Sequence, residues 1–197
     1  MKPRVKSVVK EYAESIIIAL ILAMIVRTFV VQAFKIPTGS MRMTLIERDR
    51  ILVNKYIYRH ITPKLAAVLT KYAPIFREPE RGDVVVFRYP LEPKRDFIKR
   101  LIGKPGETVK IENGFIYING ERIDSPPAIK QTYYYNNHGD YGTGPEGTKI
   151  PEDSYFVLGD NSAYSQDSRY WGFVPRKYLL GKAMVIYWPI NRMRIIR

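Results

Sequence analysis

The hydrophobic positions of this chain form one continuous block near the start and short, interrupted runs afterwards. Residues 16–26 are all apolar, and apolar residues continue with a few polar interruptions as far as Phe34. A bilayer core is crossed by roughly 20 helical residues, so the pattern predicts one N-terminal transmembrane helix ending near Phe34. Arg27 lies close to the end of this span, where its long stem can reach the membrane boundary.

The residues before the apolar block are basic, with Lys2, Arg4, Lys6 and Lys10. Basic residues next to a span favour the cytoplasmic side, and long domains cross the membrane largely regardless of charge. The sequence therefore predicts a single-pass protein of the cytoplasmic membrane. Residues 1–34 form a cytoplasmic leader and an anchor, and residues 35–197 form an extracytoplasmic domain.

Two other interpretations of the apolar block stay open. Residues 31–33 loosely fit a cleavage site, so the block could be a cleaved signal peptide, although Arg27 interrupts it and bulky Phe34 would follow the cut. It could also be a buried helix of a globular protein, against which the basic leader argues.

After Phe34 the pattern changes to short runs of β-branched and aromatic residues, which are typical of strands. Two Asn-Gly pairs, at residues 113–114 and 119–120, supply the positive φ angles of tight hairpin turns and predict a meander over residues 108–122. The expected fold class is mainly β, with antiparallel sheets. The other predicted strands cover residues 50–56, 83–87, 96–102, 154–158 and 182–188.

Two segments differ from this pattern. Residues 61–76 carry an apolar stripe at helical spacing with lysines beside it, which fits either a helix on a lipid surface or an ordinary surface helix. Residues 123–150 are rich in Pro, Gly, Asn and Tyr and predict an extended loop or hairpin arm. We therefore expect an inserted arm over about residues 104–155.

Composition narrows the chemistry. The 197 residues include no cysteine, which excludes disulfides, thiolate metal sites and a thiol nucleophile. The formal charge of +13 predicts attraction to an anionic partner, either phospholipid or nucleic acid. The basic residues are spread along the chain without a dense tract, so nucleic acid is not the expected partner.

Ser40 and Lys99 are the candidate nucleophile and base, because the chain offers only His60 and His138 as histidines. A serine hydroxyl needs a base, and a lysine serves as one only when burial lowers its pKa from about 10.4. Strand alternation places Lys99 on the same face as Phe97 and Leu101. Taken alone, Ser40 fits an ordinary loop serine and Lys99 an ordinary solvated lysine.

A third segment, residues 159–174, is a polar loop with small hydroxyls, two acids and one arginine. Such a loop can orient a buried lysine through a serine hydroxyl. We expect Asp160, Asp167 and Arg169 to form a structural network and Ser165 to be the orienting residue.

Taken together, the segments resemble the bacterial type I signal peptidases, the membrane-anchored Ser-Lys endopeptidases of protein export. Their order along the chain matches the family from the anchor to near the C-terminus, and four ordered motifs are far more specific than any one of them. The motifs are Gly39-Ser40-Met41, Arg81-Gly82-Asp83-Val84-Val85, Lys99-Arg100, and Gly159-Asp160-Asn161 continuing through Asp167-Ser168-Arg169-Tyr170-Trp171-Gly172.

The resemblance implies a sheet architecture shared with self-cleaving repressors and a serine endopeptidase that needs neither metal nor cofactor. Ser40 would be the nucleophile and Lys99 the general base. The backbone N–H of Ser40 and the hydroxyl of Thr38 would hold the oxyanion, and Ser165 would hydrogen-bond Lys99.

The resemblance also implies the substrate: signal peptides of exported preproteins, bound as an added β-strand between the serine segment and the lysine strand. Shallow pockets would select small residues at the first and third positions before the cut. The expected pocket residues are Phe34, Ile36, Met41, Leu45 and Ile98.

The chain departs from the family pattern at two places. Met43 stands where the family usually has proline, and residues 61–76 are inserted before Arg81. Two rival functions remain: a self-cleaving repressor, against which the anchor argues, and a non-catalytic anchored β domain that binds export partners or lipid.

Overall fold

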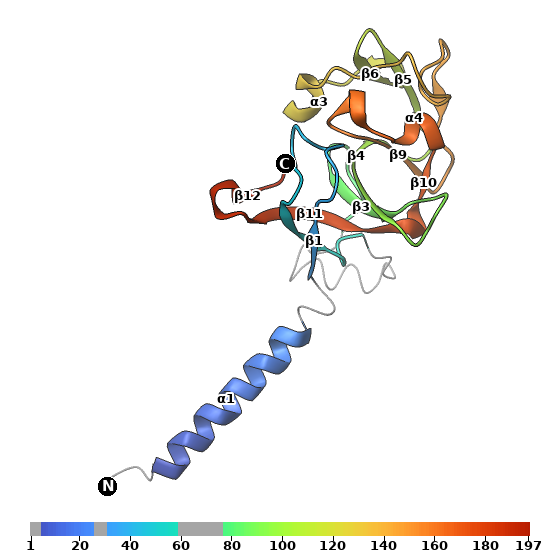
Figure 1. Cartoon of the computed structure of the whole chain (residues 1–197). Helices are drawn as coiled ribbons and strands as arrows, with labels where there is room; N and C mark the ends of the chain where they lie inside the picture. Colours follow the sequence, from blue (N-terminus) through green and yellow to red (C-terminus); the bar gives the residue numbers. More distant parts are fainter. Residues whose placement is uncertain (1–4, 26–30, 59–76) are drawn as a thin grey trace.

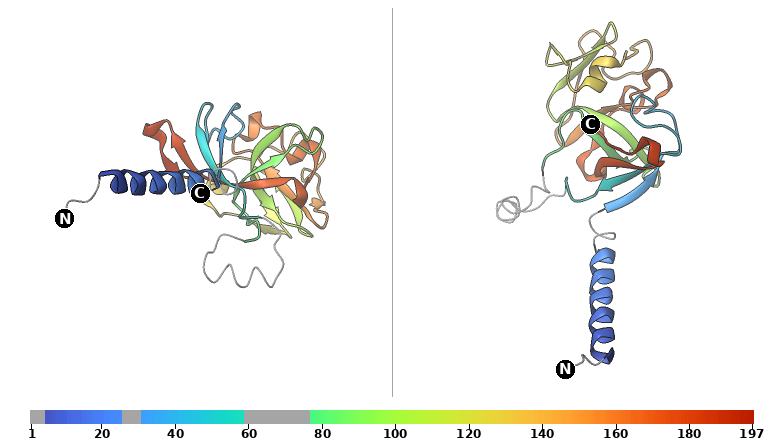
Figure 2. Two further views of the ribbon diagram at one scale, coloured as in Figure 1. Left: turned by 90° about the horizontal axis from the view of Figure 1, so that it is seen from below. Right: turned by 90° about the vertical axis from the view of Figure 1, so that its left-hand side faces the viewer.

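The structure is a computed structural model that describes residues 5–25, 31–58 and 77–197. It consists of an N-terminal helix, α1 (Val5–Ile25), and a β-rich body, from which α1 stands away (Figures 1 and 2). The mainly β, antiparallel fold class is confirmed. The predicted helical insertion at residues 61–76 lies outside the described residues.

The predicted end of the N-terminal helix, near Phe34, is wrong. The helix begins at Val5, because its lysines and glutamates (Lys6, Lys10, Glu11 and Glu14) are themselves good helix formers. Residues 31–34, which we expected in the helix, belong to strand β1 (Val31–Lys35) instead. β1 pairs antiparallel with β2, with Phe34 opposite Ile51.

Across residues 5–25, 31–58 and 77–197, no helix is both long enough and apolar enough to cross a bilayer. The structure therefore does not support the predicted transmembrane helix. In α1 the continuous apolar run begins only at Ile16. The residues before it include the charged Lys6, Lys10, Glu11 and Glu14.

The main sheet has eight strands in the order β1-β2-β11-β3-β4-β9-β10, with β12 paired to β11. All its pairings are antiparallel, and the strands predicted around residues 50–56, 83–87, 96–102, 154–158 and 182–188 are confirmed. The remaining strands are β2 (Arg50–Asn54), β3 (Val84–Arg88), β4 (Asp96–Gly103), β9 (Ser154–Leu158), β10 (Val174–Pro175), β11 (Leu179–Trp188) and β12 (Arg194–Ile195).

Strand β4 carries the candidate lysine through the middle of this sheet, between β3 and β9. Its alternating side chains enter two different clusters, because successive residues of a strand point to opposite faces. Ile98 packs against one cluster, whereas Phe97 and Leu101 belong to the other. The predicted face of Lys99 is therefore confirmed.

The segment between β4 and β9 forms a second, four-stranded sheet in the order β7-β6-β5-β8. Both Asn-Gly pairs adopt positive φ at each residue, which confirms the predicted meander. This small sheet has its own buried cluster and lies at the end of the body opposite α1 (Figures 1 and 2), so it is more than the hairpin arm we expected. Its strands are β5 (Thr108–Glu112), β6 (Phe115–Ile118), β7 (Glu121–Arg122) and β8 (Thr148–Lys149).

Short helical turns complete the fold, and the sequence pattern did not predict them because each is no more than five residues long. One of them, η2, continues directly from the Gly159-Asp160-Asn161 segment. They are α3 (Pro127–Gln131), η2 (Ser162–Tyr164), α4 (Ser168–Trp171), η3 (Arg176–Tyr178) and η4 (Ile190–Arg192).

Candidate active site

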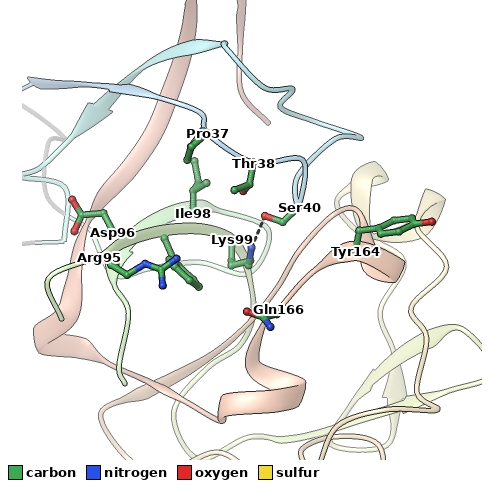
Figure 3. Close-up of a pocket in the computed structure, with 10 residues that line it drawn as sticks. Pro37, Thr38, Ser40, Arg95, Asp96, Ile98, Lys99, Tyr164 and Gln166 are labelled. Carbon is green, nitrogen blue, oxygen red and sulfur yellow. Dashed lines mark hydrogen bonds between the residues drawn. The ribbon is translucent and has the colours of Figure 1, made fainter. Parts of the chain in front are cut away.

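Ser40 and Lys99 meet in the folded chain although 59 residues separate them. Ser40 lies in the turn that follows β1, and Lys99 lies on β4. The Lys99 Nζ donates a hydrogen bond to the Ser40 Oγ at 2.5 Å (Figure 3). Lys99 is 4% exposed and Ser40 is 8% exposed. The pair is thus almost entirely shielded from water, yet both residues line one cleft.

Burial lowers the pKa of Lys99 from its ordinary value to about 8. Removing an ammonium ion from water disfavours its charged form. The carboxylates of Asp167 and Asp160 oppose this effect, and the guanidinium of Arg169 adds to it. A sizeable fraction of Lys99 is therefore neutral near pH 8, with a nitrogen lone pair available for the Ser40 hydroxyl proton.

The turn that carries Ser40 is fixed by Asn161, which follows β9. The Asn161 Nδ2 donates to the Gly39 carbonyl at 2.9 Å, and its backbone N–H donates to the Ser40 carbonyl at 3.0 Å. Gly159 allows this close approach: a Cβ there would lie 2.6 Å from the Ser40 carbonyl oxygen and 2.1 Å from the Ser165 Oγ. From the sequence alone, Asn161 had no predicted role beyond its place in a motif.

Arg100 points to the opposite face of β4 from Lys99 and anchors a buried network. Its guanidinium forms a two-pronged ion pair with Asp160 at 2.8 and 2.7 Å and also donates to Thr44 Oγ1 at 2.9 Å. The Thr44 hydroxyl donates to Asp160 in turn. This network joins the turn after Ser40 to β4 and to the segment after β9. Asp160 is structural, as predicted, but its partner is Arg100 and not Arg169.

Asp167 and Arg169 form a second buried network, which confirms their predicted pairing. Arg169 contacts both carboxylate oxygens of Asp167, at 2.8 and 2.9 Å. The same carboxylate accepts the backbone N–H of Gly159 at 3.0 Å. Arg169 also donates to the Ser162 hydroxyl and to the Tyr135 carbonyl. The loop behind Lys99 is therefore held by paired charges.

The cleft beside the pair has a volume of about 450 Å³ and opens to solvent. Figure 3 shows the Ser40–Lys99 pair between two ends of this cleft, with Asp96 and Arg95 at one end and Tyr164 at the other. The lining residues are Pro37, Thr38, Ser40, Arg95, Asp96, Phe97, Ile98, Lys99, Tyr164 and Gln166.

This geometry offers an alcohol, an amine with a lowered pKa and an open cleft, which are the parts that nucleophilic acyl transfer needs. The family model described as "Signal peptidase, peptidase S26" matches residues 9–188. The chain belongs to this family. It is therefore a peptidase of the signal peptidase type.

Several signal peptidases are similar over most of their length. A protein of Synechocystis sp. named as a probable signal peptidase I-2 is 39% identical, over 94% of this chain and 76% of that protein. Signal peptidase I of Leptolyngbya laminosa is 38% identical, over 98% of this chain and 86% of that protein. Signal peptidase I of Pseudomonas aeruginosa is 37% identical, over 93% of this chain and 74% of that protein.

The residues expected to line substrate pockets in this signal peptidase family member fall in different places. Ile98 lines the cleft. Ile36, Met41 and Leu45 are buried in the core cluster, and Phe34 packs against it. These four residues lie in or against the core and outside the lining of the open cleft, and their role as pocket residues stays a prediction.

The predicted oxyanion donors lie where they are accessible. Thr38 lines the cleft next to Ser40. Within the described part of the chain, neither the Thr38 hydroxyl nor the Ser40 backbone N–H donates a hydrogen bond. Both donors are therefore available to a ligand in the cleft.

The predicted hydrogen bond from Ser165 to Lys99 is not formed. Ser165 is buried, but its Oγ has no hydrogen-bond partner among the residues that the structure describes. Its side chain packs against Gly159, whereas the Lys99 Nζ is directed at Ser40. Ser165 therefore shields the site and does not orient the lysine in this state.

Proposed function

We propose that this chain is an endopeptidase that removes signal peptides from exported preproteins, with Ser40 as the nucleophile and Lys99 as the general base. The observation that carries the proposal is the 2.5 Å contact between a buried lysine nitrogen and a buried serine oxygen at the floor of an open cleft. The names of the similar signal peptidases support the same substrate class.

In the proposed mechanism, neutral Lys99 takes the proton of the Ser40 hydroxyl as the oxygen attacks the scissile carbonyl carbon. The resulting ammonium returns the proton to the leaving amine when the peptide bond breaks. Water then attacks the acyl-enzyme ester, with Lys99 as base again, and restores free Ser40. Ser-Lys pairs are an established variant of the serine triad.

The negative charge on the carbonyl oxygen would be held by the Ser40 backbone N–H and the Thr38 hydroxyl. Thr38 and Ser40 line the cleft, and neither of these donors has a hydrogen-bond partner in the described part of the chain, so neither must break a bond to serve the transition state. One such donor is typically worth about 3–4 kcal/mol of transition-state stabilisation.

The substrate would lie extended between residues 37–38 and β4, as a strand added to the sheet. Ile98 lines the wall of the cleft along this path. Small side chains at the first and third positions before the cut fit a narrow space between the two segments, because alternate residues of a strand face the same side.

We also propose that the N-terminal segment attaches the chain to the cytoplasmic membrane, with its leader in the cytoplasm and the β-rich body outside. The supporting observations are that α1 stands away from the body (Figure 2) and that it carries exposed apolar side chains. Its exposed apolar residues are Tyr12, Ile16, Ile17, Ile18, Leu20, Ile21 and Met24.

Substitution of the pair tests the proposed function. Ser40→Ala and Lys99→Ala should each lower cleavage of a preprotein with an Ala-x-Ala site on the order of 10³-fold or more, since either change disables the nucleophile. The readout is the appearance of mature protein, with circular dichroism to check folding. Lys130→Ala, on exposed α3, is the matched control and should keep full activity.

Near-normal turnover by Ser40→Ala would refute the proposed function. Intact binding of export partners or lipid by a chain without any cleavage activity would favour the non-catalytic alternative instead.

A further inference from the structure

The end of the cleft that carries Tyr164 suggests how the substrate residues that follow the scissile bond are held. This inference rests on the proposed function. The cleft is lined by Pro37, Thr38, Ser40, residues 95–99, Tyr164 and Gln166. Figure 3 shows Tyr164 on the opposite side of Ser40 from Arg95 and Asp96.

The direction of the substrate follows from this arrangement. The part of the peptide before the cut would pair with β4 and residues 37–38, toward the first end of the cleft, where Arg95 and Asp96 lie. A polypeptide that passes the nucleophile must leave by the other end, so the residues after the cut would cross Tyr164.

Tyr164 is held firmly relative to the nucleophile although its side chain is open to solvent. It ends the turn η2, and its backbone N–H donates to the Asn161 carbonyl at 3.0 Å. Asn161 in turn donates its own backbone N–H to the Ser40 carbonyl at 3.0 Å. Two backbone hydrogen bonds therefore connect Tyr164 to Ser40 through Asn161. Tyr164 itself is 82% exposed, among the most exposed of the large hydrophobic residues.

The two ends of the cleft also differ in charge. Arg95 and Asp96 line the first end, whereas Tyr164 at the other end is uncharged. An exposed aromatic ring gains most from contact with another apolar or aromatic side chain. We propose that Tyr164 is a specificity-determining residue that binds the first residues after the cut and favours an apolar or aromatic side chain there.

The test uses two substrates that share the same residues before the cut. One is a peptide that continues for several residues with phenylalanine soon after the cut, and the other ends at the cut in a fluorogenic amide. With the full chain, Tyr164→Ala should lower kcat/KM for the long peptide by about five- to tenfold, as loss of an aromatic contact predicts. It should change kcat/KM for the amide less than twofold.

Two further variants separate binding from structure. Tyr164→Phe should keep the wild-type preference, because the ring and not the hydroxyl makes the contact. Tyr133→Ala, a matched control at an exposed tyrosine outside the cleft lining, should leave both substrates unaffected.

Equal losses on both substrates, or no loss on the long peptide, would overturn the role of Tyr164 while leaving the proposed peptidase intact. A wild-type chain that cleaves neither substrate would instead refute the proposed function, and this inference with it.

Discussion

At the residue scale, the central feature is a lysine whose pKa is lowered to about 8 because it is buried. The residue types of the pair could be predicted from the sequence, since the chain offers few other bases. Their distance could not, because Ser40 and Lys99 meet only through long-range folding. Strand alternation correctly gave the face of Lys99 and could also have placed Arg100 on the opposite face.

The predicted pocket residues show a limit of sequence reasoning at this scale. Ile36, Met41 and Leu45 are apolar residues next to the nucleophile, and an apolar residue there suits a pocket wall as well as a core. Only the path of the turn decides between the two, and local pattern does not encode that path.

The lowered pKa of Lys99 predicts the pH dependence of activity. Since only the neutral amine accepts the Ser40 proton, kcat/KM should rise about tenfold per pH unit below pH 8 and level off above it. The measurement is a kcat/KM profile from pH 5 to pH 10 on a peptide without ionisable side chains. A flat profile would contradict a role for Lys99 as base.

The same pKa has a consequence for stability. Below pH 8 Lys99 is charged in both the folded and the unfolded chain, and the folded chain carries the full cost of burying the ammonium. Between pH 8 and the ordinary lysine pKa of 10.5, the unfolded chain alone binds the proton, so stability rises with pH there. Above pH 10.5 Lys99 is neutral in both states, so the folded chain no longer carries the cost of burying an ammonium.

Lys99→Met should therefore raise the free energy of unfolding at pH 7 by about 3 kcal/mol, since each pKa unit is worth about 1.4 kcal/mol. The gain should shrink as the pH approaches 10. Urea denaturation at several pH values measures this gain in the free energy of unfolding. Lys130→Met, at an exposed lysine of α3, is the control and should show no change of stability with pH. A gain that does not change with pH would argue against a lowered pKa.

At the scale of the elements, the site depends on how β4, β9 and the turn after β1 are tied together. Most strands, and the meander with its two Asn-Gly turns, could be predicted because their signals are local. The short strands β8, β10 and β12 could not, since two-residue strands exist only through their partners. The register that brings Asn161 to Ser40 has no local signal either.

Asn161 should prove to be a positioning residue. Asn161→Ala removes the hydrogen bond to the Gly39 carbonyl, so the turn that carries Ser40 loosens and kcat should fall on the order of tenfold to a hundredfold, because small misplacements of reacting groups are costly. KM should change less than threefold. Steady-state kinetics on a peptide substrate measure both parameters.

The matched control is Asn136→Ala. Its side chain makes a comparable bond to the Ile111 carbonyl at 3.1 Å, in the small sheet. It should keep the wild-type kcat. Equal effects of the two substitutions would show that loss of stability, and not misplacement of Ser40, is the cause.

At the scale of the whole molecule, the chain combines a β-rich body, an N-terminal helix with exposed apolar residues and a net charge of +13. The fold class was predictable from strand patterns and from the order of the motifs. The extent of the N-terminal helix could not be predicted in the same way. A hydropathy pattern marks only apolar residues, whereas this helix also contains lysines and glutamates. It also does not show that residues 31–34 pair with β2.

The charge predicts preferential binding to anionic membranes. The purified chain should bind vesicles with about one third anionic lipid more tightly than zwitterionic vesicles, since each basic residue near such a surface contributes about 1 kcal/mol. Raising the salt to about 0.5 M should reduce the difference by screening. Flotation with the two kinds of vesicle measures it, and equal binding would contradict the prediction.

The tie between Asn161 and Gly39 spans 122 positions of the sequence. During synthesis, the nucleophile is therefore made long before the segment that fixes its turn. A growing chain therefore carries Ser40 before the segment that completes the proposed catalytic centre has been made.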